Sequence, residues 1–394
     1  MNIKSFAKNM FDPLPAEIIG LLNKVPGLID KTFPLPGRFR LKLPANAAEL
    51  SRLLTSGRGE RKLAYLNQPA LLSAYLRYFL PWNLYRLCRL LHSLNLPLSA
   101  NDRISDLGCG PLTFAAALWI SRPELRTMPL EIQCIDISGP ALDAGKKIFA
   151  ALAGENAPWK ITTIRADVSS AKAKPAALVC AINVFNEMYG DIAHNSGERL
   201  LRNAVKTASL LKRLGGAGAS LLLVEPGIPR CGEFLSALRF ILLQKGYQPL
   251  APCLHSRDCP FPGGKSAAGK ARWCHFAFET DDAPQELHTI SIAAGLPKER
   301  AVLSFLLAAP AKAGKKHTEA DISGSFPARI ISDLFPLPNG YFGRYGCSEH
   351  GLIMLTGTKN AITAIPSGAL AGVISVKGKT DAKSGAIITV SSEQ

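Results

Sequence analysis

Apolar side chains recur every three or four positions through most of the first hundred residues, which is the spacing of amphipathic helices. The pattern is clearest in residues 46–57 (NAAELSRLLTSG) and 69–95 (PALLSAYLRYFLPWNLYRLCRLLHSLN). Pro81 interrupts the second segment, so we expect that helix to kink or to divide there. The sequence therefore predicts a helical N-terminal region.

From residue 102 onwards the pattern changes to short apolar runs that alternate with helical segments. Such alternation predicts a parallel sheet with right-handed crossover connections. The predicted strands lie in residues 103–110, 130–138, 159–169, 176–188 and 219–227, and the helices in residues 111–122, 139–154 and 198–214.

The last third of the chain predicts further strands, separated by polar loops. Residues 273–279 and 301–311 are two apolar runs, and three shorter runs follow at 328–335, 341–347 and 351–357. The residues after about 375 are polar, so we expect a flexible tail.

The charge of the chain is strongly positive and unevenly distributed. The formal net charge is +16, and the first hundred residues hold 14 Lys and Arg against 5 Asp and Glu. A basic protein of this kind favours a polyanionic partner, most often RNA. Arg77, Arg86 and Arg89 alternate with aromatic residues, and they either stack on RNA or pack against the next domain with their charged ends at the surface.

Two absences in the sequence set expectations about location. The chain has no apolar run of roughly 18 residues that could span a bilayer, and its N-terminus has no apolar region typical of a signal peptide. We therefore expect a protein of the bacterial cytoplasm that crosses no membrane. We also expect it to be a monomer. Thiols stay reduced in that compartment, which argues against structural disulfides.

A glycine turn and two acidic residues indicate a nucleotide-type site. Asp106 ends the first predicted strand, and Gly108 and Gly110 let the backbone approach a ligand before the next helix. Asp136, at the end of the second strand, is placed to hold ribose hydroxyls, and Asp167, after the third, to reach the adenine. The D-x-G-x-G spacing favours S-adenosylmethionine over a dinucleotide, and the set resembles the class I methyltransferases.

The segment after the fourth strand does not identify a catalytic group. It reads INVFNEMYGD, with Asn183, Asn186 and Glu187, whereas amine methyltransferases often have an N-P-P-Y-type turn there. Cytosine methylation needs a cysteine nucleophile, and Cys253 follows the fifth strand, which is the wrong place. The catalytic residues therefore stay unassigned.

Four cysteines lie in or near polar loops, where packing alone does not explain a thiol. Their spacing differs from the short pairs of structural zinc sites, and irregular sets of four are common in iron–sulfur proteins. His255 or His275 could replace one thiolate. The candidate ligands are Cys253, Cys259, Cys274 and Cys347; Cys88, Cys109, Cys134, Cys180 and Cys231 are expected in the core.

Several motifs resemble the methyltransferase-like small-ribosomal-subunit family, which has mitochondrial and bacterial members and includes human methyltransferase-like protein seventeen. The motifs are YLRYFLPWNLYRL, VEPGIPRCGEF, APCLHSRDCPFP, WCHF and LPKERAVLSFLL, and the resemblance runs from about Leu43 to Leu355. It implies a [4Fe-4S] cluster on the four candidate cysteines, and binding to the small ribosomal subunit and its rRNA during assembly.

Together these observations predict an α/β protein with a class I methyltransferase (Rossmann-like) doubly wound sheet, an N-terminal helical region and a C-terminal cysteine-ligated, β-rich extension. We expect a ribosome-associated factor, with an active rRNA methyltransferase and an iron–sulfur redox sensor as alternatives. The expected parts are a basic helical region (1–100), an S-adenosylmethionine-type core (101–250), a cysteine-rich insertion with the final sheet strands (251–310), a small β-rich region (311–375) and a flexible tail (376–394).

Overall fold

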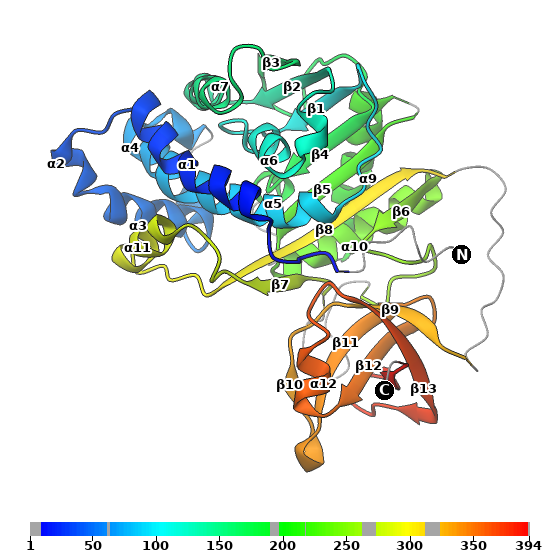
Figure 1. Cartoon of the computed structure of the whole chain (residues 1–394). Helices are drawn as coiled ribbons and strands as arrows, with labels where there is room; N and C mark the ends of the chain where they lie inside the picture. The colour runs from blue at the N-terminus through cyan, green and yellow to red at the C-terminus, as the bar shows by residue number, and fades with distance from the viewer. Residues whose placement is uncertain are drawn as a thin grey trace.

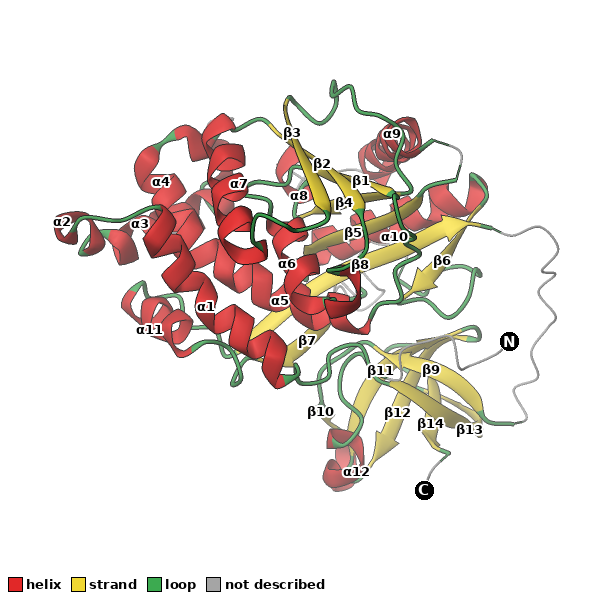
Figure 2. Cartoon of the chain, turned by 45° about the horizontal axis from the view of Figure 1, so that its top comes forward, coloured by secondary structure: helices red, strands yellow, loops and turns green. Residues whose placement is uncertain are grey.

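The structure is a computed structural model that describes residues 9–60, 64–189, 197–216, 218–261, 273–311 and 324–392. A helical layer from the N-terminal region lies against one face of a large sheet, and a separate small barrel lies beyond one end of that sheet (Figures 1 and 2). No described helix combines the length and the apolar character that crossing a membrane requires.

The N-terminal region is helical, as the apolar spacing predicts. The helical segment that contains Pro81 is interrupted by a π-helical turn, Tyr75–Phe79, which ends two residues before the proline. The proline ring clashes with the preceding turn of a regular α-helix, and the wider turn accommodates it. The helices are α1 (Ala16–Thr32), α2 (Gly37–Arg40), α3 (Leu43–Leu54), α4 (Pro69–Ala74) and α5 (Leu80–Ser93).

The aromatic residues that alternate with Arg77, Arg86 and Arg89 pack into a core and do not offer a stacking surface. Tyr78 and Tyr85 are almost fully buried. Arg77 and Arg89 are also buried, because ion pairs to Asp30 and Asp282 hold their guanidinium groups inside the protein. Arg86 is half-buried, and its Nη2 donates to Asn183 Oδ1 at 3.0 Å. The prediction that these arginines stack on RNA is therefore wrong. They pack against the next domain, as the alternative expected, but the charged ends of Arg77 and Arg89 are buried and do not lie at the surface.

The large sheet has the order β3-β2-β1-β4-β5-β8-β6, with β7 paired to β8. Its first five strands are parallel, whereas β8 runs antiparallel to its neighbours. This is the class I methyltransferase fold that the sequence predicts. The strands are β1 (Arg103–Leu107), β2 (Leu130–Asp136), β3 (Trp159–Arg165), β4 (Leu178–Ile182), β5 (Ser220–Pro226), β6 (Tyr247–Ala251), β7 (Phe276–Glu279) and β8 (Arg300–Pro310).

Helices cover both faces of this sheet, and each face has its own hydrophobic core. One core joins the sheet to the N-terminal helices, α6 and α7, and the other joins it to α9 and α10 (Figure 1). The remaining helices are α6 (Thr113–Ser121), α7 (Gly139–Ala153), α8 (Phe185–Met188), α9 (Gly197–Gly215), α10 (Pro229–Gln244), α11 (Gln285–Ala293) and α12 (Lys359–Thr363).

The C-terminal strands close into a small barrel. The pairings run β9-β11-β12-β14-β13 and return from β13 to β9, with β12 and β14 parallel and α12 between β12 and β13. Five strands in this order with a helix after the third have the topology of an OB-fold. The strands are β9 (Phe326–Ile330), β10 (Phe335–Pro336), β11 (Phe342–Ser348), β12 (Gly351–Gly357), β13 (Leu370–Thr380) and β14 (Ile387–Ser391).

The prediction of a flexible tail over residues 376–394 is wrong for most of these residues. β13 extends to Thr380, and β14 pairs with both β12 and β13. β14 contains the β-branched run Ile387, Ile388, Thr389 and Val390, which favours a strand. The run is short and has polar residues on both sides, so the sequence pattern did not predict it. Residues 393 and 394 lie outside the described residues.

Candidate functional site

The glycine turn joins β1 to α6 at the carboxyl edge of the sheet. Gly108 and Gly110 have φ values of +58° and +53°, a region that side chains with a Cβ atom rarely adopt. The Gly110 N–H donates to Asp136 Oδ2 at 2.8 Å, and the Ser138 N–H donates to Asp136 Oδ1 at 2.8 Å. The carboxylate at the end of β2 therefore fixes the turn that follows β1.

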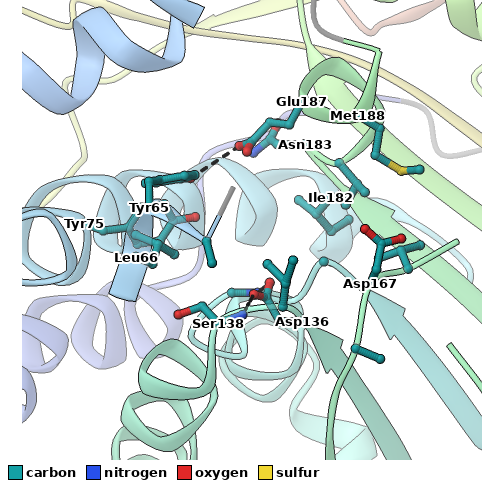
Figure 3. Close-up of a pocket in the computed structure, with 17 residues that line it drawn as sticks. Tyr65, Leu66, Tyr75, Asp136, Ser138, Asp167, Ile182, Asn183, Glu187 and Met188 are labelled. Carbon is teal, nitrogen blue, oxygen red and sulfur yellow. Dashed lines mark hydrogen bonds between the residues drawn. The ribbon is translucent and has the colours of Figure 1, made fainter. Parts of the chain in front are cut away.

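These residues line a cleft with an empty volume of about 900 Å³, part of which is open to solvent. Gly108, Gly110, Asp136 and Asp167 all contribute to its wall, so the structure brings four of the five predicted residues together (Figure 3). Asp167 lies at the exposed rim, where its Oδ1 accepts the Ser169 N–H at 2.8 Å.

Asp106 lies behind this cleft and does not line it. Its side chain is fully buried and borders a smaller cavity together with Tyr75, Asn83 and Thr113. Cys180 Sγ donates to Asp106 Oδ1 at 3.5 Å, and Oδ2 has no hydrogen-bond partner among the residues that the structure describes. Burial raises the pKa of Asp106 to about 8, so the carboxyl is mainly protonated at neutral pH.

Two tyrosines from the N-terminal region complete the cleft, and sequence reasoning did not assign them to it. Tyr65 and Tyr75 face Glu187 across the opening, and Tyr65 Oη donates to Glu187 Oε1 at 3.5 Å (Figure 3). Burial raises the pKa of Tyr75, and the charges of Glu187 and Asp136 raise it further. Their position depends on how the helical layer folds over the sheet, which no local motif specifies.

The segment after β4 is positioned by a buried carboxylate that the sequence also did not reveal. Glu225, on β5, accepts the Phe185 N–H at 2.8 Å and the Asn186 side-chain amide at 2.9 Å. Burial raises the pKa of Glu225 to about 7. Asn183 and Glu187 line the cleft, whereas Asn186 is buried against Glu225 and has a structural role.

The four candidate cysteines converge from three separate segments. Cys253 and Cys259 belong to the loop after β6, Cys274 precedes β7, and Cys347 lies on β11 of the barrel. All four are partly buried. Burial raises the pKa of Cys274 well above its usual value, and the sulfurs of the other three cysteines, which lie close to it, raise it further. We call these four residues the cysteine cage.

The two histidines named as alternative ligands have different surroundings. His255 lies beside the cage, with Nε2 at 3.4 Å from Cys347 Sγ. The His275 ring stacks on Trp273, with 4.6 Å between ring centroids, and its Nδ1 is 3.2 Å from the Trp273 carbonyl oxygen. Of the two, His255 is therefore the one adjacent to a cage sulfur.

A buried arginine on α10 borders the cage. Arg239 is 4% exposed, and its Nη2 donates to the carbonyl oxygens of His255 and Arg257, both at 2.8 Å. Burial raises the pKa of Cys253, and the charge of Arg239 acts in the opposite direction there and at Cys347. A buried cation beside four thiols fits an anionic centre such as an iron–sulfur cluster held by thiolates.

The other five cysteines are buried, as predicted. Cys109 and Cys134 lie below the glycine turn, where their sulfurs and a carboxylate oxygen of Asp106 are within 4.8 Å of one another. These groups are enclosed in the core between β1 and β2, whereas the cage cysteines are partly exposed.

Comparison with solved structures finds methyltransferases of low sequence identity. A putative class I S-adenosylmethionine-dependent methyltransferase from Listeria monocytogenes is 10% identical and covers 77% of this chain and 90% of its own, with a TM-score of 0.34. Magnesium protoporphyrin IX methyltransferase from Synechocystis, with bound S-adenosylhomocysteine, is 13% identical, covers 54% and 75%, and has a TM-score of 0.31. None of the curated proteins compared with the chain matches it.

The comparison with protein families gives a match over a large part of the chain. The matching family is described as mitochondrial small ribosomal subunit Rsm22, and its model covers residues 72–333. This range includes the glycine turn and the first three cage cysteines, and it ends before Cys347 and most of the barrel. Because the match covers about two thirds of the sequence, the chain belongs to the Rsm22 family.

Proposed function

We propose that this chain associates with the small ribosomal subunit, contacts its rRNA during assembly, and carries a [4Fe-4S] cluster. The observation that carries the proposal is the convergence of four cysteines from two parts of the fold beside a buried arginine. The family description, which names the small ribosomal subunit, supports the choice of partner.

The proposed cluster ligands are the four residues of the cage. Iron–sulfur clusters are commonly held by four cysteine thiolates. The proposal is supported by four free cysteines, three of which are near enough to the fourth, Cys274, to raise its pKa. Arg239 would offset part of the negative charge of such a centre. Because Cys347 lies on β11 and the other three ligands lie beside β6 and β7, the bound cluster would connect the barrel to the large sheet.

The cleft at the carboxyl edge of the sheet is proposed to bind S-adenosylmethionine. Its volume suits a ligand of this size. Asp136 would accept hydrogen bonds from the ribose, and the two glycines of the turn leave room for the methionine part. When bound, S-adenosylmethionine supplies an activated methyl group; we assign no catalytic residue and no methyl acceptor.

The proposal is tested by sedimentation of the anaerobically purified protein with purified small ribosomal subunits. We expect the protein to sediment with the subunits, and to do so less at high salt because phosphate contacts are screened. A protein that stays in the supernatant at low salt would contradict the proposed partner.

Two further measurements on the same mixture of protein and ribosomal subunits distinguish the two alternatives from the main proposal. Transfer of labelled methyl groups from S-adenosylmethionine to rRNA would favour an active methyltransferase, whereas binding of the cofactor without transfer would favour an assembly factor. Binding to the subunit that changes when the cluster is oxidised would favour a redox sensor.

A further inference from the structure

Residues 36–42 form an exposed segment around α2, which we call the basic projection. Every residue of this segment is exposed, and none of α2 is buried. Leu41 is 85% exposed and Phe39 is 45% exposed. Both views place α2 at the outer edge of the helical layer, away from the barrel (Figures 1 and 2).

The charges of the projection distinguish it from an ordinary exposed apolar surface. Arg38, Arg40 and Lys42 alternate with Phe39 and Leu41 in the sequence RFRLK. Arg40 pairs with Asp30, near the end of α1, at 2.9 Å. Asp30 also pairs with the buried Arg77. That acidic group therefore offsets at most one of the three positive charges, and the surface complements a polyanion.

The shape of the projection is fixed before any partner binds. The Leu41 N–H donates to the Gly37 carbonyl oxygen at 3.2 Å, and the Lys42 N–H donates to the Phe39 carbonyl oxygen at 3.1 Å. The Arg38 guanidinium lies 4.9 Å from the centre of the Phe39 ring. A preformed pair of an aromatic ring and a cation reduces the entropy lost on binding.

We propose that the basic projection is a contact for single-stranded RNA, in which Phe39 stacks on a base while Arg38 and Lys42 bind neighbouring phosphates. Aromatic stacking combined with basic side chains is the usual way in which proteins bind single strands. An interfacial membrane helix is longer, with one apolar face, whereas α2 has four residues. This inference rests on the proposed function, and it names the surface that meets the RNA.

The test measures binding of a labelled single-stranded RNA of sixteen nucleotides to the full-length, cluster-loaded chain. Phe39→Ala should weaken binding about tenfold to a hundredfold, because a base no longer stacks on the ring. Arg38→Gln combined with Lys42→Gln should lower the slope of log affinity against log salt by about 0.7 for each phosphate that these side chains neutralise in the wild type. The matched control is Phe240→Ala on α10, since Phe240 is 46% exposed, and it should bind like the wild type.

The possible results distinguish this inference from the proposed function. Wild-type binding with no loss in Phe39→Ala, or an equal loss in Phe240→Ala, would overturn the projection as the RNA site and leave the proposed function standing. No RNA or subunit binding by the wild type would overturn both. If the Phe39 variant loses binding only to vesicles of anionic lipid and keeps its RNA affinity, the surface binds membranes and the inference is wrong.

A second inference comes from Arg239 and is independent of the projection. Its two hydrogen-bonded carbonyl oxygens, of His255 and Arg257, both lie in the loop between Cys253 and Cys259. We propose that Arg239 is a positioning residue, which holds this ligand loop and sets the reduction potential of the cluster through its charge. This inference rests on the proposed cluster.

The test compares the cluster in Arg239→Gln, Arg239→Lys and the wild type. The Gln variant should lose its cluster in air about tenfold faster and have a more negative reduction potential, because a neighbouring positive charge favours the added electron. The Lys variant should restore the potential. Arg344→Gln is the matched control, since Arg344 is also buried and donates to two carbonyl oxygens.

An Arg239→Gln protein with wild-type potential and lifetime would overturn this role while leaving the cluster in place. A wild-type protein that binds no iron would overturn the cluster and this role together.

Discussion

The glycine-turn cleft and the cysteine cage both contain buried or half-buried polar groups. They differ in how far apart in the sequence the residues lie that form them. The predicted residues of the cleft come from consecutive β-α units of one sheet, and Asp136 fixes the glycine turn through two backbone hydrogen bonds. The cage joins loops of the large sheet to β11 of the barrel. The glycine turn and its carboxylate are therefore a property of one sheet, whereas the cage depends on how the barrel packs against that sheet.

Other contacts support the packing between these domains. Tyr345 and Leu352, on the outer surface of the barrel, pack against the hydrophobic core that joins the large sheet to the N-terminal helices. Arg300 on β8 pairs with Asp333 of the barrel, with 2.7 Å between Nη1 and Oδ2. In an OB-fold the second and third strands commonly form the ligand-binding face. Here Cys347, Tyr345 and Leu352 of those strands face the large sheet.

The first prediction concerns the cage and has the largest expected effect. Cys347→Ser should lose most of its iron, as should the same change at the three other cage cysteines, because each removes one thiolate ligand. Iron per chain after anaerobic purification is the measurement. Cys180→Ser is the control, since Cys180 is buried below the cleft, and it should keep its iron. Full iron in Cys347→Ser would make His255 the next candidate ligand.

The second prediction concerns the cleft. Asp136→Ala removes a charged acceptor for the ribose, so the affinity for S-adenosylmethionine should fall by about tenfold to a hundredfold in calorimetry. Iron content should be unchanged, because the cage is built from other elements. Asp143→Ala, an exposed change on α7, should bind normally. No binding by the cluster-loaded wild type up to millimolar concentration would remove the cofactor from the proposal.

The third prediction uses the buried carboxyl below the cleft. The folded pKa of Asp106 is about 8, whereas an unfolded Asp titrates near 4. Between these values the folded protein holds a proton that the unfolded chain releases, so the free energy of unfolding falls as pH rises through this window. Thermal midpoints should drop by a few degrees from pH 5 to pH 8, and Asp106→Asn should reduce that drop. A midpoint that rises with pH in both proteins would contradict the raised pKa.

The fourth prediction compares the two glycines of the turn. Gly108→Ala and Gly110→Ala both place a side chain at positive φ, which costs about 1 to 2 kcal/mol. A Cβ at Gly108 would also lie 2.7 Å from Val184 Cγ2, whereas at Gly110 the nearest atom is Tyr75 Oη at 3.8 Å. Chemical denaturation should therefore show the larger loss of stability for Gly108→Ala. Equal losses would mean that Val184 moves aside without cost.

The two regions also differ in how far the sequence could predict them. The glycine turn and Asp136 follow from local strand-turn-helix patterns, and the structure places them in the wall of one cleft. That they bind a cofactor stays a prediction. Tyr75 and Glu225 reach the same site only through packing between elements distant in the sequence, which periodicity does not report. Arg239 lies in an apolar helical pattern and gives no sign that it contacts the loop after β6.

The barrel shows the same limit. Apart from β13, its strands have seven residues or fewer, and they include glycines and polar residues, so the closure between β13 and β9 could not be predicted from alternation alone. Their positions in polar loops identified the four cysteines, the family resemblance implied a cluster on them, and in the structure the other three lie near enough to Cys274 to raise its pKa. The metal that they bind stays a prediction.

The most direct measurement of the central claim is the metal content of the anaerobically purified wild-type chain together with its absorbance spectrum. The proposal predicts about four iron atoms and about four acid-labile sulfides per chain, with a broad absorbance at about 400 nm from sulfur-to-iron charge transfer. One zinc ion per chain with no iron, or a colourless protein without metal, would contradict it.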